Sequence, residues 1–204
     1  MTRLGLIGGT FDPPHIGHLI ISQEALAKLD LEKVIFVPAG RPLFKGRVVT
    51  DATLRWEMLN LAVSSNPNFI CTRKEIDREG PSYTVDTLKT LEREHGHNSG
   101  IYLIMGMDAF LDLKRWKEPE EIISLCHIVV AKRPGYERSK VADLEKALPA
   151  IRARYTLLDT PLVDISSTSI RRRVKEGISI KYLVPETVEK FIEDKGLYRG
   201  QNSG

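Results

Sequence analysis

Short aliphatic runs alternate with stretches of helical periodicity along most of the chain. Runs of this kind are expected to form buried strands, and they lie at residues 4–7, 33–38, 69–72, 101–105, 128–131 and 155–158. Between them, apolar residues recur at spacings of three and four, as in Leu54, Met58, Leu59 and Ala62, which is typical of a helix with one buried face. Parallel strands need crossover helices, so this alternation predicts an α/β fold with a doubly wound parallel sheet.

Polar residues mark the expected beginnings of three helices. Thr50 or Asp51 precedes the first, Ser82 or Thr84 the second, and Asp108 the third. Each can accept a hydrogen bond from a free N–H group of a first turn. Asp108 has a second interpretation, because it follows a strand at the sheet edge where ligands bind and could accept hydrogen bonds from ribose hydroxyls. The start of the second helix could likewise offer its N–H groups to a carboxylate.

The most distinctive stretch follows the first strand and reads GGTFDPPHIGH from Gly8 to His18. Gly8 and Gly9 allow the main chain to approach a phosphate closely. His15 and His18, three residues apart at the start of a helix, lie on one face where free N–H groups attract anions. Two imidazoles there can donate hydrogen bonds to phosphoryl oxygens as charge builds, which predicts nucleotidyl transfer with both as catalytic residues. The alternative, two surface histidines on an ordinary amphipathic helix, fits the complete block less well.

Three further segments carry candidate binding residues. The stretch from Ser166 to Arg171 opens a helix with hydroxyls, free N–H groups and a guanidinium, which suits an anion. Trp116 is flanked by two cations, so it is a better ring-stacking candidate than Trp56, which lies in a helix expected to be buried. The segment 42–47 carries two cations beside a glycine, and it fits a phosphate clamp and a solvated loop equally well.

Composition limits the domain count, the partners and the compartment. The chain has 204 residues, 42% of them hydrophobic, which suffices for one α/β core. We expect a single domain over residues 1–199, including a helical part at about 166–199, and a flexible tail at 200–204. The formal charge of +3 does not indicate nucleic acid, and no apolar run reaches membrane-spanning length. Cys71 and Cys126 lack metal-ligand spacing, so we expect reduced thiols and a cytoplasmic location.

The block from Gly8 to His18 resembles the H-x-G-H nucleotidyltransferase superfamily, an element that class I aminoacyl-tRNA synthetases share. A wider set of motifs adds Pro81–Thr84, Gly106, Asp108, Trp116, Arg133-Pro134-Gly135 and Ile165–Arg171. Together with the first block, this set resembles the bacterial nicotinate-nucleotide adenylyltransferases, in order from about residue 4 to residue 199. The family implies adenylyl transfer from ATP to nicotinate mononucleotide, which gives deamido-NAD and pyrophosphate in NAD biosynthesis. Its phosphate nucleophile is ionised at neutral pH, so the lack of an evident general base is expected.

The resemblance assigns the candidate residues to two substrates. ATP is expected at Gly8, Gly9, Thr10, Phe11, Gly106, Asp108, Ser167, Thr168 and Arg171, with the last segment holding the leaving pyrophosphate. Nicotinate mononucleotide is expected at Lys45, Ser82, Tyr83, Thr84, Trp116 and Arg133. The family commonly shows Pro-Pro-His-Lys where this chain has Pro42-Leu43-Phe44-Lys45, so only Lys45 is retained from that loop. Mg²⁺ is expected with ATP, held mainly by phosphates and water, because no clustered carboxylates indicate a metal site of the protein itself.

Three alternatives differ in their requirements. A phosphopantetheine or glycerol-phosphate nucleotidyltransferase shares the front motif but would not need Pro81–Thr84 or Trp116. A synthetase fragment would need a tRNA-binding extension and a lysine-rich signature, and the sequence shows neither. A non-catalytic nucleotide-sensing module could lose His15 or His18, yet both are present. The sequence therefore favours an enzyme with small-molecule partners, without nucleic acid or membrane, and it is compatible with a homo-oligomer.

Overall fold

A computed structural model describes residues 2–42, 49–96, 100–132, 138–161 and 163–199. Within this part of the chain, six strands form one parallel sheet in the order β3-β2-β1-β4-β5-β6. The strands are β1 Arg3–Gly9, β2 Lys33–Pro38, β3 Phe69–Cys71, β4 Gly100–Gly106, β5 His127–Ala131 and β6 Tyr155–Leu158. The predicted doubly wound sheet is confirmed, and its order reverses between β1 and β4, which is where such sheets open a crevice for ligands.

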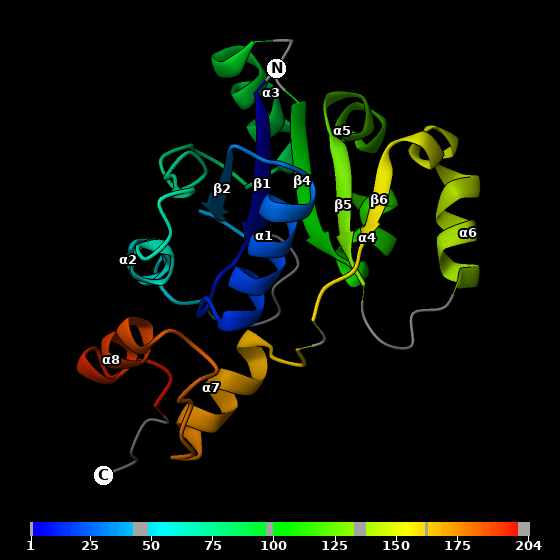
Figure 1. Ribbon diagram of the computed structural model, residues 1–204. Helices are drawn as coiled ribbons and strands as arrows, with labels where there is room; N and C mark the ends of the chain where they lie inside the picture. The colour runs from blue at the N-terminus through cyan, green and yellow to red at the C-terminus, as the bar shows by residue number, and fades with distance from the viewer. Residues whose placement is uncertain (1, 43–48, 97–99, 133–137, 162, 200–204) are drawn as a thin grey trace.

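The helices cover both faces of the sheet (Figure 1). They are α1 Ile16–Lys28, α2 Ala52–Val63, α3 Thr84–His95, α4 Met107–Leu111, α5 Pro119–Leu125, α6 Arg138–Ala147, α7 Ser167–Lys175 and α8 Glu186–Asp194, with 3₁₀ turns η1 Leu113–Arg115 and η2 Pro149–Ala153. One buried cluster joins the sheet to α3, α4, α5 and α6, and a second joins its other face to α1 and α2. Successive residues of a strand serve opposite faces, as Leu103 and Ile104 of β4 do.

The two last helices lie beyond the carboxyl edge of the sheet, where Figure 1 shows α7 and α8 below β1. A third cluster anchors them, because Met58 and Ala62 of α2 pack with Ile170 of α7 and with Val188 and Ile192 of α8. α2 therefore buries one side against the sheet and another against the C-terminal part. This arrangement brings the beginning of α7 to the edge where β1 and α1 meet.

Helix beginnings differ from prediction at two of three places. Asp51 caps α2 as expected, accepting from the N–H of Thr53 at 2.8 Å. Tyr83, not Ser82 or Thr84, is the N-cap of α3, because the Ser82 hydroxyl is used by another loop. Gly106 is the N-cap of α4, which places Asp108 inside the first turn rather than at the cap.

The environment of α2 also corrects a prediction. Trp56 is only partly buried, and the guanidinium of Arg73 lies 5.0 Å from the centre of its ring. Its neighbour Arg55 is the residue that faces the interior, with 1% of its surface exposed. The buried face of α2 thus runs through Arg55, Met58 and Leu59, one position away from the tryptophan.

Cys71 and Cys126 are both free thiols, as predicted. Cys126 is buried and Cys71 is half-buried, and burial raises the pKa of each to about 12. Both are therefore protonated and poorly nucleophilic at neutral pH. Of the helices described, none is long and apolar enough to cross a membrane.

Candidate active site

A cavity of about 790 Å³ opens at the carboxyl edge of the sheet, between β1, β4 and the C-terminal part. Sequence-predicted site residues that line it are Gly8, Gly9, Thr10, His15, His18, Ser82, Thr84, Gly106, Trp116 and Ser167. These residues come from five separate segments of the chain. Their convergence supports the prediction that the carboxyl edge near β1 is the binding site.

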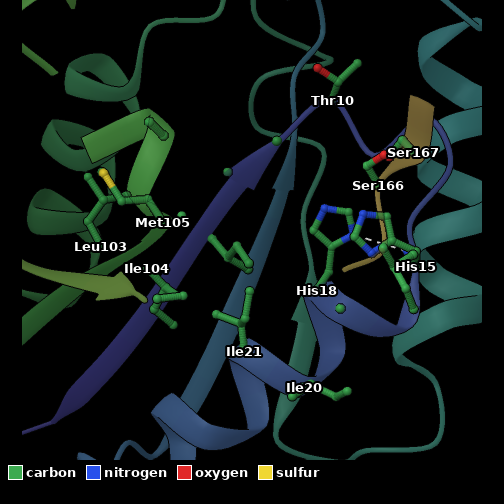
Figure 2. Close-up of a pocket in the computed structure, with 18 of the residues that line it drawn as sticks. Thr10, His15, His18, Ile20, Ile21, Leu103, Ile104, Met105, Ser166 and Ser167 are labelled. Atoms are coloured by element: carbon green, nitrogen blue, oxygen red, sulfur yellow. Dashed lines mark hydrogen bonds between the residues drawn. The ribbon is translucent and has the colours of Figure 1, made fainter. Parts of the chain in front are cut away.

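His15 and His18 lie against each other at the beginning of α1 (Figure 2). His15 is the N-cap, and His18 is the third residue of the helix. Their ring centroids are 3.6 Å apart with an interplanar angle of 26°, so the rings are stacked. The main-chain N–H of His15 donates to Nδ1 of His18 at 3.1 Å. The predicted placement of both histidines on one helix face is confirmed.

The surroundings of His18 determine its charge and its tautomer. Desolvation by burial, followed by the nearby His15, holds the pKa of His18 well below its usual value. The ring is therefore neutral near pH 7. Because Nδ1 accepts a hydrogen bond from His15, the single proton lies on Nε2. His18 thus carries a donor, and not a base, at the end of its ring.

The turn after β1 has its carbonyl groups occupied by protein donors. The bonds are Ala39 N to Gly9 O at 2.9 Å, Arg55 Nη1 to Thr10 O at 2.8 Å, Arg171 Nη1 to Asp12 O at 2.6 Å and Ser167 Oγ to Pro13 O at 2.8 Å. These oxygens are the negative ends of their peptide dipoles. Directing them toward protein donors leaves the turn better suited to an anion.

Phe11 supports this turn with its side chain. The whole residue is 2% exposed, and its ring lies 3.2 Å from the position of a β-carbon added at Gly9 and meets the ring of His18 edge-on at 5.0 Å between centroids. The residue is therefore part of the core, and it does not line the cavity. The close approach also explains why position 9 needs a glycine, because a side chain there would crowd the ring.

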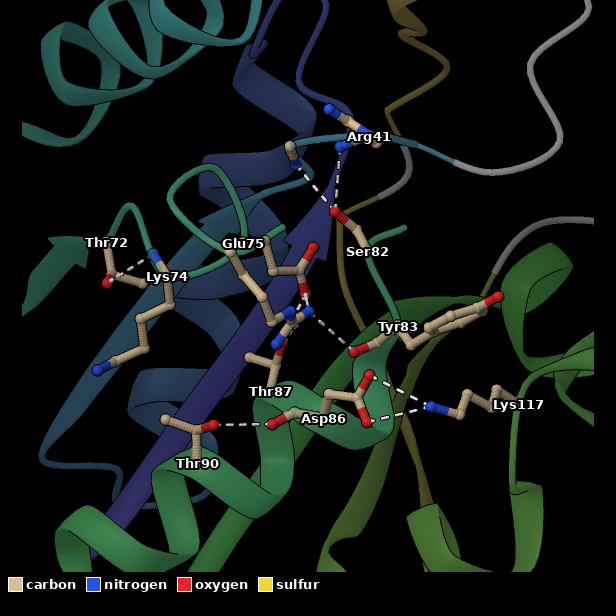
Figure 3. A network of polar contacts seen from close by, with 12 residues as sticks. Arg41, Thr72, Lys74, Glu75, Ser82, Tyr83, Asp86, Thr87, Thr90 and Lys117 are labelled. Atoms are coloured by element: carbon tan, nitrogen blue, oxygen red, sulfur yellow. Dashed lines mark hydrogen bonds and ion pairs between the residues drawn. The ribbon is translucent and has the colours of Figure 1, made fainter. Parts of the chain in front are cut away.

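The opposite wall of the cavity is formed by the beginning of α3 and by Trp116. Thr84 is the first residue of α3, and Tyr83 is its N-cap. The ammonium of Lys117 lies 4.7 Å from the centre of the Tyr83 ring and 3.4 Å from the carboxylate oxygens of Asp86. Figure 3 shows the contact of Lys117 with Asp86. Lys117 thus ties the segment that carries Trp116 to the first turn of α3.

Several predicted residues lie away from the cavity wall. Asp108 and Thr168 are exposed, and neither lines the cavity. Arg171 is half-buried, and its guanidinium donates hydrogen bonds to Asp12 O and, at 3.1 Å, to Thr168 Oγ1. Lys45 and Arg133 lie outside the described residues.

Two residues that the sequence interpretation missed contact the turn. Arg55 donates to Thr10 O, and Tyr198 donates its hydroxyl to Oδ1 of the buried Asp12 at 2.7 Å. A signal for Arg55 was present, because it is a charge on the helix face that Met58 and Leu59 bury. Tyr198 had no such signal, since it lies 186 positions away from Asp12.

The residues that the structure describes include no dedicated set of metal ligands. Among the residues described, no group of three or more His, Cys, Asp or Glu side chains could hold one. The cavity lining combines apolar side chains, such as Ile21 and Leu103, with hydroxyls, the imidazoles of His15 and His18, and main-chain groups of the turn after β1. Its few hydroxyl and main-chain oxygens fit a hard cation that arrives with the oxygens of a nucleotide and keeps its water.

Comparison with known proteins gives consistent results. The family model described as cytidylyltransferase-like matches residues 6–173. A probable nicotinate-nucleotide adenylyltransferase of Moorella thermoacetica is 47% identical, with 99% of this chain and 94% of the relative covered. One of Desulfitobacterium hafniense is 45% identical, with 97% and 96% covered. In structure, the chain is similar to a Plasmodium falciparum nicotinic acid mononucleotide adenylyltransferase complexed with NaAD, with a TM-score of 0.79, 18% identity, and 97% and 98% covered.

Proposed function

The chain belongs to the cytidylyltransferase-like family, among the nicotinate-nucleotide adenylyltransferases, and we propose that it transfers the adenylyl group of ATP to nicotinate mononucleotide. The products are deamido-NAD and pyrophosphate. The observation that carries the proposal is the stacked histidine pair at the cavity, with a neutral donor at Nε2 of His18.

The mechanism needs positioning and charge stabilisation. A phosphate oxygen of nicotinate mononucleotide attacks the α-phosphorus of ATP, and the bond from that phosphorus to the bridging oxygen of pyrophosphate breaks. Negative charge on the α-phosphoryl oxygens is stabilised by His18 Nε2–H and by His15, while Gly8, Gly9 and Thr10 bring the main chain close to the phosphates. No general base is required, because the nucleophile is already ionised.

Each substrate has its own side of the cavity. The N–H groups at the beginning of α3 receive the nicotinate carboxylate, and Trp116 stacks on the pyridinium ring. Ser167 and Arg171 hold the leaving pyrophosphate from their places beside the turn. The proposal also retains the ribose contact of Asp108, the ATP contacts of Gly106 and Thr168, the contacts of Lys45 and Arg133, and Mg²⁺ bound with ATP.

The proposal is tested by pairing nucleotides with acceptors. ATP or CTP is supplied with nicotinate mononucleotide, nicotinamide mononucleotide, phosphopantetheine or glycerol 3-phosphate, and pyrophosphate release and product mass are measured. We expect ATP with nicotinate mononucleotide to be used far better than any other pair, because helix N–H groups reward a carboxylate and offer no acceptor to a carboxamide. Equal use of the two pyridine nucleotides would rule out the carboxylate pocket, and preferred use of CTP would rule out adenylyl transfer.

A further inference from the structure

Arg55 is a buried cation that bonds to two residues of the cavity wall, Thr10 and Ala39. Its Nη1 donates to Thr10 O at 2.8 Å, in the turn after β1. Its Nη2 donates to Ala39 O at 2.7 Å and, at a longer 3.4 Å, to Gly40 O, in the loop after β2. Its Nε donates to Thr50 O at 2.8 Å, next to the beginning of its own helix. One guanidinium therefore joins the turn after β1 to both ends of the connection between β2 and α2.

Ser82 holds the same loop from the opposite side. Its Oγ accepts from the N–H of Gly40 at 2.9 Å and from the N–H of Arg41 at 3.2 Å (Figure 3). In a planar trans peptide, the C=O and the N–H point in opposite directions. Two successive peptide groups are thus each held between Arg55 and Ser82. Ser82 in turn directly precedes the N-cap of α3, where the nicotinate carboxylate is proposed to bind.

A third contact is made by the main chain of Gly40, which lies directly against Glu75. A β-carbon at Gly40 would lie 2.2 Å from the main-chain oxygen of Glu75, so the loop passes directly against that segment. The carboxylate of Glu75 accepts from Thr87 Oγ1 of α3 at 2.6 Å. Residues 39–41, at the start of the loop after β2, are therefore contacted by Arg55, Ser82 and Glu75, and the last two connect them to α3.

From these contacts, and resting on the proposed function, we propose that Arg55 is a positioning residue for both substrates. It fixes the turn that receives the ATP phosphates and, through Ser82, the helix beginning that receives the nicotinate. One buried side chain thereby sets the distance between the reacting groups. A misplacement of about 1 Å between reactants can cost on the order of 10²-fold in rate. Lysine cannot substitute, because a single ammonium does not reproduce the planar fork that reaches two loops.

The test compares four variants by steady-state kinetics and thermal unfolding. Arg55→Met and Arg55→Lys are expected to lower kcat/KM by about 10²-fold, with KM raised for both ATP and nicotinate mononucleotide. Ser82→Ala should raise KM for nicotinate mononucleotide alone. Val63→Ala, at the buried far end of the same helix, controls for lost stability and should leave both KM values unchanged. Arg55 variants that lose only thermal stability, with kinetics like those of Val63→Ala, would overturn the proposal.

A second measurement separates this proposal from the proposed function. Amide hydrogen exchange at Gly40 and Arg41, followed by NMR without substrates, should become at least about tenfold faster in Arg55→Met and stay unchanged in Val63→Ala. Unchanged protection in Arg55→Met would overturn the positioning role even in an active adenylyltransferase. A wild type that makes no deamido-NAD would instead refute the proposed function, and the two amides would still decide the role of Arg55.

Discussion

The two ring nitrogens of His18 have different tasks, and two substitutions separate them. Nδ1 accepts from the His15 N–H at 3.1 Å, while the proton on Nε2 is the proposed donor to ATP. The amide of Asn reaches the place of Nδ1 and can keep the acceptor, but it has no group at the place of Nε2. The amide of Gln reaches the place of Nε2 with a donor and loses the acceptor. His18→Asn should therefore keep its stability and lose kcat. His18→Gln should lose some stability and keep more of its kcat.

The expected sizes follow from these two bonds. Removing one preorganised donor from a site of developing charge lowers kcat by about 10²–10³-fold, or roughly 2.7–4 kcal/mol. We expect this loss in His18→Asn, with KM for ATP nearly unchanged, because the donor acts mainly in the transition state. The bond to the His15 N–H contributes about 0.5–1.5 kcal/mol to stability. His18→Gln should lose that amount of unfolding free energy and retain more of its kcat.

The assay is pyrophosphate release at saturating substrates, combined with urea unfolding of the same preparations. His127→Asn is the matched control, because this histidine begins β5 at the amino ends of the strands, opposite the cavity. Its ring forms a hydrogen bond with Thr156 Oγ1 at 2.8 Å. It should leave kcat unchanged. A wild-type kcat in His18→Asn, or a lower kcat in His18→Gln than in His18→Asn, would refute Nε2–H as the working donor.

Three further results are expected from the same site. Trp116→Ala should raise KM for nicotinate and nicotinamide mononucleotide alike, because the pyridinium ring is common to both, and a loss confined to the acid in steady-state kinetics would contradict this. Arg171→Lys should lower kcat/KM by about tenfold, since a point charge cannot replace a guanidinium fork, whereas equal losses in Arg172→Lys would mean that only general charge matters. Below about pH 6.5 the unfolding free energy should fall by up to roughly 1.4 kcal/mol per pH unit, because unfolded His18 binds a proton that the folded form excludes. Urea unfolding of His18→Asn should show a shallower pH slope, and equal slopes would argue against a buried neutral His18.

Local patterns were enough to predict the sheet, most helices and the histidine pair. Strand runs such as Val34–Val37 and the three-residue spacing of His15 and His18 depend on neighbours in the chain, so periodicity and capping rules apply directly. The same rules failed at Ser82 and Trp56. The Ser82 hydroxyl accepts from Gly40 and Arg41, which lie 42 and 41 residues away, and so it does not cap α3. The orientation of α2 buries Arg55 instead of the neighbouring tryptophan.

The sequence by itself therefore determined the order of the elements and the chemistry at the carboxyl edge of β1. The tertiary structure alone decided which distant groups complete that chemistry. Ser167 reaches Pro13 across 154 positions, and Arg171 reaches Asp12 across 159. Such contacts depend on strand order and on how α7 docks against α2, and no local pattern encodes either. The neutral state of His18 likewise arises from burial, which exists only once those distant segments have come together.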